Sequence, residues 1–558
     1  DAMINQLELN NKKPAKMEVI AISDKATKRQ KTLTDKTKGA KGQDNLGKSP
    51  TRKELIDEKQ NVLNFEIDEL ERAIYAKVVQ KCGNRQHWEE WANDIAKIAK
   101  THIDRITHIL ANPENKEEIQ AFESFAKKLR NDLNDALSDA EIIEMLAQHL
   151  ITKPVFDALF SEYDFAQYNP ISLAMQDILN KLHEHHLEKE ADTLNSFYAS
   201  VKLRAEGIDN AQGKQRIIVE LYDKFFRNAF PKMTERLGIV YTPVEVVDFI
   251  IHSVNDVLKS EFNQTLADDH VHIIDPFTGT GTFITRLLQS GLIPPNRLPY
   301  KYKHEIHANE LVLLAYYIAT INIEATYHDI IFNDYTPFEG VCLTDTFQMY
   351  EHDIVTQAQD GNSARRKRQK ELDIQVIIGN PPYSAGQKSE NDNNQNVAYP
   401  SLDNRISETY AKYSKASSTK NLMDSYIRAM RWASDRIGGN GVIGFVSNAS
   451  FVDANSMDGL RKCLAEEFSS LYIFHLRGNA RTSGEQRRKE KDNVFGQGTR
   501  TPIAVSILVK NSQIEKQGEI YFHDIGDYLT REQKLEKIVE LKSITGISQK
   551  DAWQKMAE

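Results

Sequence analysis

The chain has 558 residues, of which 40% are hydrophobic and 27% are charged. This is the composition of an ordinary globular protein, which argues against a wholly disordered or fibrous chain. The length exceeds what one hydrophobic core usually organises, so we expect two or three domains. The formal net charge of −9 gives no global sign of nucleic-acid binding. It does not exclude such a partner, because a local basic cleft is enough to neutralise phosphates.

Cysteine usage and hydropathy indicate the compartment. The three cysteines, Cys82, Cys342 and Cys463, are widely separated, so neither a disulfide framework nor a CxxC metal site is expected. No apolar run approaches the roughly 20 residues of a membrane helix, and the N-terminus lacks the apolar core of a signal peptide. We therefore expect a cytoplasmic protein with no bound metal ion.

Composition separates the first part of the chain into two segments. Residues 1–52 are mostly polar and include a stretch rich in Lys, Thr, Gly and Asp. Such a segment buries little surface, so we expect a linker or the tail of an upstream domain. Residues 53–230 contain long amphipathic stretches with apolar side chains at three-and-four spacing, which predicts an all-α domain.

From residue 231 to residue 558, short β-branched runs alternate with helical stretches. This alternation predicts an α/β domain, with a mostly parallel sheet and helices on both of its faces. The runs expected to be strands are His272–Ile274, Glu305–His307, Val376–Ile378, Gly441–Val446, Leu471–Phe474 and Ile503–Val509. Two basic runs, Arg365–Arg368 and Arg487–Lys491, fit phosphate contacts and fit exposed loops equally well.

A glycine-rich loop follows the first predicted strand, in Ile273-Ile-Asp-Pro-Phe-Thr-Gly-Thr-Gly-Thr-Phe283. Gly279 and Gly281 let the backbone pass close to a ligand, and the helix expected after them offers free N–H groups. The loop lacks the Gly-Lys-Ser/Thr of a phosphate-binding loop and the third glycine of a dinucleotide fingerprint, and Asp275 stands at the strand end. An acidic group suits an ammonium ion better than a pyrophosphate. Taken alone, the loop is equally compatible with a purely structural turn.

The next predicted strand is followed by Glu310, in His307-Ala-Asn-Glu-Leu311. A carboxylate at this position can accept hydrogen bonds from both hydroxyls of a ribose. In a compact unit the acidic residue follows the glycine-rich loop by roughly 20 residues. Glu310 lies further from the loop than this, and the segment with Pro294, Pro295 and Pro299 accounts for the extra length. The alternative is a solvated acid at the start of a helix.

The tetrapeptide Asn380-Pro-Pro-Tyr383 follows a third strand pattern, at the edge of the sheet where ligands of such folds bind. An aromatic amine is a poor nucleophile because its lone pair is delocalised into the ring. The side-chain oxygen of Asn380 and the carbonyl of Pro381 can accept both amino hydrogens and favour a tetrahedral nitrogen. The consecutive prolines Pro381 and Pro382 fix that carbonyl, and Tyr383 offers a face for stacking an extruded base. A proline-rich turn is the alternative.

In this order the motifs resemble those of gamma-class amino-methyltransferases of DNA. The resemblance implies a Rossmann-like methyltransferase fold and methyl transfer from S-adenosylmethionine to N6 of a flipped-out adenine. Phe495, in the loop 494–502, is implied as a second base-stacking residue beside Tyr383, and Asp334 competes with Asp345 for the cofactor adenine. The implied cofactor contacts are Tyr241, Thr242, Pro243, Asp275, Pro276, Phe277, Gly279, Gly281, Glu310, Asp345 and Phe347, and the implied catalytic motif is Asn380, Pro381, Pro382 and Tyr383.

Segments 221–226 and 236–249 resemble the coupler-to-methyltransferase junction of bacterial single-polypeptide Type ISP restriction-modification enzymes, and the likeness covers most of residues 53–558. It implies that residues 1–52 are the tail of a motor domain, 53–230 a helical coupler and 231–558 an adenine-DNA methyltransferase domain, with the target-recognition domain absent. The implied partners are double-stranded DNA and, in the full-length protein, a covalently linked nuclease, a helicase-like motor and a target-recognition domain.

Two other functions fit the same residues. A methyltransferase acting on a protein glutamine or an RNA base needs the same pair of acceptors, although the Tyr241-Thr-Pro243 motif and the large helical domain favour DNA. A non-catalytic coupling module, whose methyltransferase fold only binds cofactor or transmits motion, is the other. The intact Asn380 and Pro381 argue against it.

Overall fold

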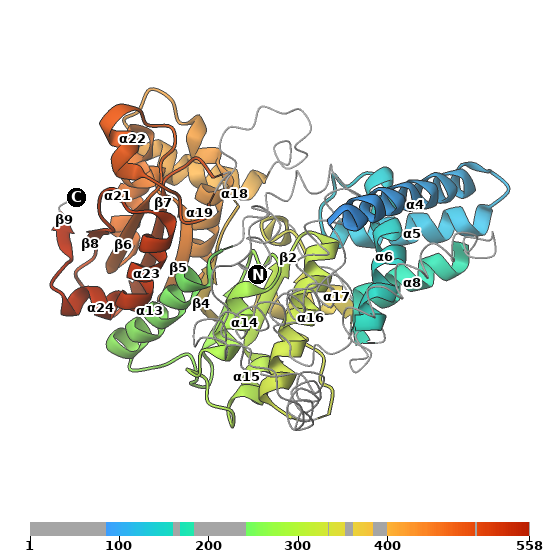
Figure 1. The fold of residues 1–558 in the computed structure, drawn as a ribbon, viewed down its shortest axis with the longest axis horizontal. Helices are drawn as coiled ribbons and strands as arrows, with labels where there is room; N and C mark the ends of the chain where they lie inside the picture. Colours follow the sequence, from blue (N-terminus) through green and yellow to red (C-terminus); the bar gives the residue numbers. More distant parts are fainter. Residues whose placement is uncertain are drawn as a thin grey trace, which may run out of the picture. The chain divides into compact units, whose positions relative to one another are not determined.

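The computed structural model describes residues 85–159, 168–182, 242–332, 334–351, 361–382, 399–496 and 499–556. Contacts group residues 85–558 into a single unit, which contains a helical region and an α/β region (Figure 1). In these described ranges, no helix is both long and apolar enough to cross a membrane.

The described part of the α/β region is built on a nine-stranded sheet with the order β3-β2-β1-β4-β5-β7-β6-β8-β9. Strands β1 to β5 pair in parallel, and β7 runs antiparallel to both of its neighbours. Beyond them, β8 is parallel to β6 and antiparallel to β9. The strands are β1 (His272–Asp275), β2 (Ile306–Glu310), β3 (Val341–Leu343), β4 (Ile374–Gly379), β5 (Asn440–Asn448), β6 (Ser470–Arg477), β7 (Ile503–Asn511), β8 (Glu519–Asp524) and β9 (Gln554–Met556).

This sheet confirms the predicted α/β class, and each run predicted to be a strand overlaps one of β1, β2, β4, β5, β6 and β7. The sequence analysis missed β3, β8 and β9. Two of these span only three residues each, Val341–Leu343 and Gln554–Met556, which is too short for a period-two pattern to stand out. β8 is half-exposed along its whole length, so it carries no buried apolar run.

Successive residues of the central strands face opposite sides of the sheet, as the pleat requires. Ile273 and Val376 belong to one apolar cluster, whereas Ile274 and Ile377 belong to the other. The first cluster is covered by α13 (Val244–Phe262), α14 (Thr282–Gln289), α16 (Leu313–Ile330) and α23 (Arg531–Leu541). The second is covered by α18 (Pro400–Ile406), α19 (Ser425–Arg436) and α21 (Asp458–Glu467). Both faces are therefore packed by helices.

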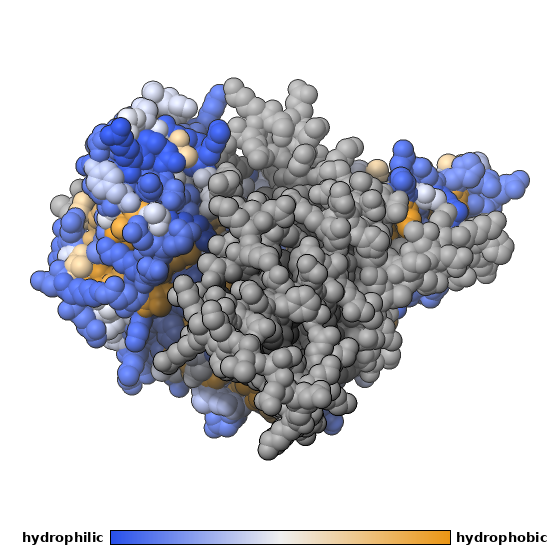
Figure 2. Space-filling view, viewed as in Figure 1, coloured by the Kyte–Doolittle hydropathy of each residue, from blue (hydrophilic) through white to orange (hydrophobic). Residues whose placement is uncertain are grey.

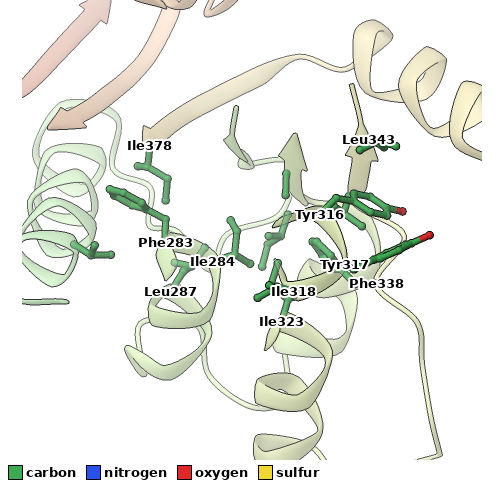
Figure 3. Close-up of a cluster of buried hydrophobic side chains, with 14 of the residues drawn as sticks. Phe283, Ile284, Leu287, Tyr316, Tyr317, Ile318, Ile323, Phe338, Leu343 and Ile378 are labelled. Atoms are coloured by element: carbon green, nitrogen blue, oxygen red, sulfur yellow. The ribbon is translucent and has the colours of Figure 1, made fainter. Parts of the chain in front are cut away.

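Helix α16 is apolar on nearly all sides, which is typical of a helix with no solvent face. Residues Leu313 to His328 are all buried. On one side Ile318 and Ile323 join the cluster with Phe283 of α14 (Figure 3). On the other side the hydroxyl of Tyr317 lies 2.9 Å from Nδ1 of His149 in the helical region. Helix α16 thus lies between the sheet and the helical region.

The helical region begins with α4 (Arg85–Ala111) and continues with α5 (Lys116–Asp132), α6 (Asp139–Leu159) and α8 (Pro170–Leu182). Its apolar side chains at helical spacing, such as Phe122, Ala126 and Leu129 of α5, are buried. This agrees with the all-α character predicted here; the amphipathic stretch 66–79 lies outside the described residues. The domain limits at 52 and 230 stay predictions.

Candidate cofactor and catalytic site

Four polar side chains follow four neighbouring strands at one edge of the sheet. Asp275 ends β1, Glu310 ends β2, Asp345 comes two residues after β3, and Asn380 comes directly after β4. These strands are parallel, so their carboxyl ends meet at the same edge. The chain leaves β1 toward β2 and β3 on one side and reaches β4 and β5 on the other. Ligands of open α/β sheets bind at such a switch point.

The two glycines of the loop after β1 have different roles. Both have left-handed backbone angles, with φ of 56° at Gly279 and 88° at Gly281. A Cβ atom on Gly281 would lie 3.2 Å from the backbone of Ala319 in α16, whereas one on Gly279 would meet no atom of the described residues within 4 Å. Gly281 therefore permits close packing of the loop against α16. Gly279 borders open space that a ligand can approach.

Asp275 is a buried carboxyl with one oxygen unused. Its Oδ1 accepts a hydrogen bond of 3.1 Å from the N–H of Phe277, while Oδ2 is buried without a donor among the described residues. Burial, with a smaller contribution from the charge of Glu310, raises the pKa of Asp275 to about 8. An uncompensated acceptor of this kind is stabilised by a cation. The residues present therefore fit a positively charged ligand.

Glu310 ties the end of β2 to the glycine-rich loop. Its Oε2 accepts the N–H of Gly279 at 2.8 Å, and its Oε1 accepts the N–H of Val312 at 2.9 Å. Burial raises the pKa of Glu310 to about 7. A carboxylate has about four lone-pair sites, so it can accept a further donor, such as a hydroxyl of a ribose, beside these backbone N–H groups.

Only one of the two competing aspartates after α16 lies at this edge. Asp334 is exposed in the segment that precedes β3, at the opposite edge. Asp345 is buried, and burial raises its pKa. Its Oδ1 accepts the N–H groups of Phe347 and Gln348 at 2.9 and 3.2 Å. Phe347 is itself buried, and the centroid of its ring lies 5.6 Å from the ring centroid of Phe277 in the glycine-rich loop.

Asp345 also receives two donors that the sequence analysis missed. Its Oδ2 accepts the hydroxyl of Tyr399 at 2.8 Å and Nδ2 of Asn134 in the helical region at 3.4 Å. Tyr399 is 54 residues from Asp345 in the chain and Asn134 is 211 residues away. No local pattern in the sequence links residues so far apart.

Asn380 presents a free amide oxygen. Its Nδ2 donates to Oγ1 of Thr242 at 3.1 Å, and its Oδ1 is buried without a donor in the described ranges. Thr242 directly precedes Pro243 and α13, so the first predicted motif orients the side chain of the motif predicted to be catalytic. Pro381 is buried and Pro382 is exposed. Tyr383 and Tyr241 lie outside the described residues.

Phe495 lies in a loop anchored by α23. The ring is half-buried and packs against the first apolar cluster. The N–H of Phe495 donates to Oδ1 of Asn493 at 3.0 Å, and Arg531 of α23 donates to the carbonyl of Val494 at 2.9 Å. This loop follows β6, whose direction is that of β5. It therefore leaves the sheet at the same edge as Asn380.

The two basic runs differ. Arg366, on α17 (Gly361–Glu371), is buried and forms an ion pair of 2.9 Å with Asp132 of α5. A phosphate contact is therefore wrong for this residue, because its guanidinium is already used inside the protein. The second run lies on and after α22 (Gly484–Glu490), where the surface is mostly hydrophilic (Figure 2) and Arg488 and Lys491 are exposed.

Comparison with known proteins gives matches over most of the chain. A family model of the coupler domain of Type ISP restriction-modification enzymes matches residues 87–213, and that of the Eco57I restriction-modification methylase matches residues 301–481. The structure of a nuclease-deletion mutant of the Type ISP enzyme LlaGI, in complex with a DNA substrate mimic, is 49% identical over 88% of this chain, with a TM-score of 0.80. The chain belongs to the Type ISP restriction-modification family.

Two further solved structures extend the comparison. The ATP-dependent Type ISP enzyme LlaBIII, bound to DNA, is 47% identical over 89% of this chain, with a TM-score of 0.81. The DrdV–DNA complex is 34% identical over 86% of this chain, with a TM-score of 0.75. A search of curated proteins gave no match.

This Type ISP chain contains the coupler and methylase regions of a restriction-modification enzyme. It covers 39% of the LlaGI chain, 34% of the LlaBIII chain and 45% of the DrdV chain. The Rossmann-like sheet is the methyltransferase fold that the resemblance implied. The four strand-end residues lie within this fold.

Proposed function

We propose that the chain is the site-specific adenine-N6 DNA methyltransferase part of its enzyme and uses S-adenosylmethionine. The observation that carries the proposal is the buried Oδ1 of Asn380 directly after β4, which has no donor in the described part of the chain. It lies at the same sheet edge as the acidic side chains of Asp275 and Glu310. An acceptor for an amino group and a buried carboxyl that suits a cation are thus on the neighbouring strands β4 and β1.

The acidic end of the pocket suits S-adenosylmethionine. The unused Oδ2 of Asp275 is an acceptor for the ammonium of the amino-acid part, and Glu310 is an acceptor for a ribose hydroxyl. Gly279 leaves open space beside them. We assign the cofactor adenine to the neighbourhood of Asp345 and Phe347. When bound, S-adenosylmethionine supplies a methyl group activated by a sulfonium.

The other end of the pocket suits the exocyclic amine of a flipped base. Asn380 Oδ1 and the carbonyl of Pro381 accept the two amino hydrogens and turn the nitrogen lone pair toward the methyl group. Thr242 holds the amide so that oxygen faces the base, because its Oγ1 takes the amide N–H. The amine gives up one proton once the new C–N bond has formed, so no strong base is needed. Tyr383 and Phe495 are proposed to stack on the base.

DNA is the proposed substrate because the relatives LlaGI, LlaBIII and DrdV are solved with DNA or a DNA mimic. In the full-length protein we propose a covalently linked nuclease, a helicase-like motor and a target-recognition domain as partners. Residues 53–230 would then be the coupler between that motor and the methyltransferase domain at 231–558.

Asn380→Ala tests the catalytic assignment. It removes the acceptor without touching the acidic end of the pocket, so methyl transfer to DNA is expected to fall by at least about 100-fold. Affinity for S-adenosylmethionine, measured by equilibrium dialysis with labelled cofactor, is expected to stay within about twofold. The matched control is Asn448→Ala at the end of the adjacent strand β5, whose Oδ1 is already occupied by Ser450. Loss of cofactor binding in Asn380→Ala would instead make Asn380 a structural residue.

A further inference from the structure

The end of helix α5 in the coupler is bound tightly to helix α17 of the methyltransferase part. Asp132, the last residue of α5, accepts hydrogen bonds from Asn362 at 2.9 Å, from Ser363 at 2.7 Å and from Arg366 at 2.9 Å. The side chains of Asp132 and Arg366 are each 4% exposed. One coupler carboxylate thus gathers three donors from a single turn of α17, away from water.

Helix α17 in turn holds the loop that follows β3. Asn362 makes two hydrogen bonds of 2.9 Å with the backbone of Leu343, one to its N–H and one to its carbonyl. Arg366 donates through Nε to Oγ1 of Thr344 at 3.0 Å. We call residues 343–348 the cofactor loop, because they carry Asp345 and Phe347. The same side chains that bind Asp132 therefore also fix the start of this loop.

The cofactor loop has two more links, one on each side. Asn134, just after α5, donates to Oδ2 of Asp345 at 3.4 Å. On the opposite side, Oγ1 of Thr346 donates to the carbonyl of Pro276 in the glycine-rich loop at 2.6 Å. A continuous series of contacts therefore runs from the coupler through the cofactor loop to the strand end that carries Asp275.

The buried ion pair between Asp132 and Arg366 is the contact of this series whose loss would cost the most free energy. Among the described residues, the other acceptors of Arg366 are neutral: the carbonyl of Asn131 and the hydroxyl of Thr344. Removing the charge of Asp132 would leave a buried guanidinium uncompensated, which is far more disruptive than losing an exposed pair. The contact between coupler and cofactor loop is therefore sensitive to a single atom change at Asp132.

We propose that Asp132 and Asn134 of the coupler are positioning residues for the cofactor loop. Their contacts with the methyltransferase part then set the affinity for S-adenosylmethionine. Because binding equilibria are linked, bound cofactor stabilises these contacts of the coupler by the same factor. This inference rests on the proposed function. It extends that function by giving the coupler, which contributes none of the four strand-end residues, a direct influence on the methyltransferase site.

Asp132→Asn tests the inference in the full 558-residue chain. Labelled S-adenosylmethionine is titrated by equilibrium dialysis, and we expect affinity to fall by about 10-fold. Asp139→Asn is the matched control, because Asp139 pairs with Arg130 at the surface of the same coupler, with a side chain 67% exposed. Its affinity should remain within about twofold of the wild type. Equal affinities for Asp132→Asn and Asp139→Asn would overturn the inference and leave the proposed function intact.

Hydrogen exchange of the wild-type chain provides a second measurement, which does not depend on the folding of a variant. Added S-adenosylmethionine is expected to slow amide exchange both at residues 343–348 and at residues 129–137 of the coupler. Slower exchange at 343–348 alone would overturn the inference. If the wild type retains no labelled cofactor, the proposed function fails and the inference falls with it.

Discussion

The two edges of the sheet bury acidic side chains in opposite ways. At the amino edge, Glu305 directly precedes β2 and pairs with the buried ammonium of Lys301 at 2.8 Å, while its other oxygen accepts the N–H of His270 at 2.6 Å. At the carboxyl edge, Asp275 and Glu310 have no ion-pair partner among the described residues, and burial raises the pKa of both.

This is the difference expected between a structural carboxyl and one that a ligand completes. The amino-edge carboxyl has a cation within the protein, because Lys301 lies 2.8 Å from Glu305 and also donates to the carbonyls of Asp268 and Val271 at 3.0 and 2.7 Å. Asp275, in contrast, has no cation paired with it among the described residues, and its buried Oδ2 has no donor there. Proteins tolerate such uncompensated groups where a ligand completes them.

The largest expected effect comes from breaking the amino-edge pair. Lys301→Met leaves the carboxyl of Glu305 buried without a cation, and the free energy of unfolding should fall by about 3–5 kcal/mol. Denaturant unfolding followed by circular dichroism measures this loss. Cofactor affinity of the folded fraction should be unchanged, since Lys301 lies at the far edge. A loss below about 1 kcal/mol would show that the amino-edge pair is not structural.

Asp275→Asn should affect the two properties in the reverse sense. The substitution keeps the shape and removes the charge, so affinity for S-adenosylmethionine should fall by about 30-fold, on the order of 2 kcal/mol. Stability of the cofactor-free protein should not fall at pH 8.5 and is expected to rise, because an uncompensated buried charge is removed. Equilibrium dialysis and denaturant unfolding measure the two effects. A variant that binds cofactor normally would remove Asp275 from the site.

The stability gain of Asp275→Asn should depend on pH. An aspartate in the unfolded chain has a pKa of about 3.9, and in the folded protein the pKa of Asp275 is raised to about 8. The folded state therefore holds the extra proton between these values, so this contribution to stability is complete below about pH 4 and is lost as pH rises through 8. The variant lacks this dependence, and its advantage over the wild type should disappear at pH 5. An equal advantage at both pH values would contradict the account.

Local patterns predicted most of the sheet and the shared edge on which the candidate site residues lie. The alternation of short β-branched runs with helices located six strands, and strand ends in a parallel sheet necessarily share an edge, so Asp275, Glu310 and Asn380 could be brought together from the sequence. Gly279 and Gly281, which the sequence analysis singled out in the glycine-rich loop, both have positive φ angles in the structure.

What local patterns could not predict are contacts between distant segments. The bond between Asn134 and Asp345 joins residues 211 positions apart, and the ion pair of Asp132 with Arg366 joins residues 234 apart. Helical periodicity shows that Arg366 lies in a basic, polar run, but it does not show that the coupler covers it. For the same reason the sequence could not decide between Asp334 and Asp345, whereas their placement before and after β3 separates them.

The most direct test of the central claim is transfer of labelled methyl from S-adenosylmethionine to mixed-sequence duplex DNA, to tRNA and to a protein extract, followed by digestion and identification of the labelled product. The account predicts label in DNA, recovered as N6-methyladenine. Label recovered in tRNA or in protein glutamine would contradict it and favour a methyltransferase of that class. Cofactor binding without label in any substrate would contradict it in favour of a non-catalytic coupling module.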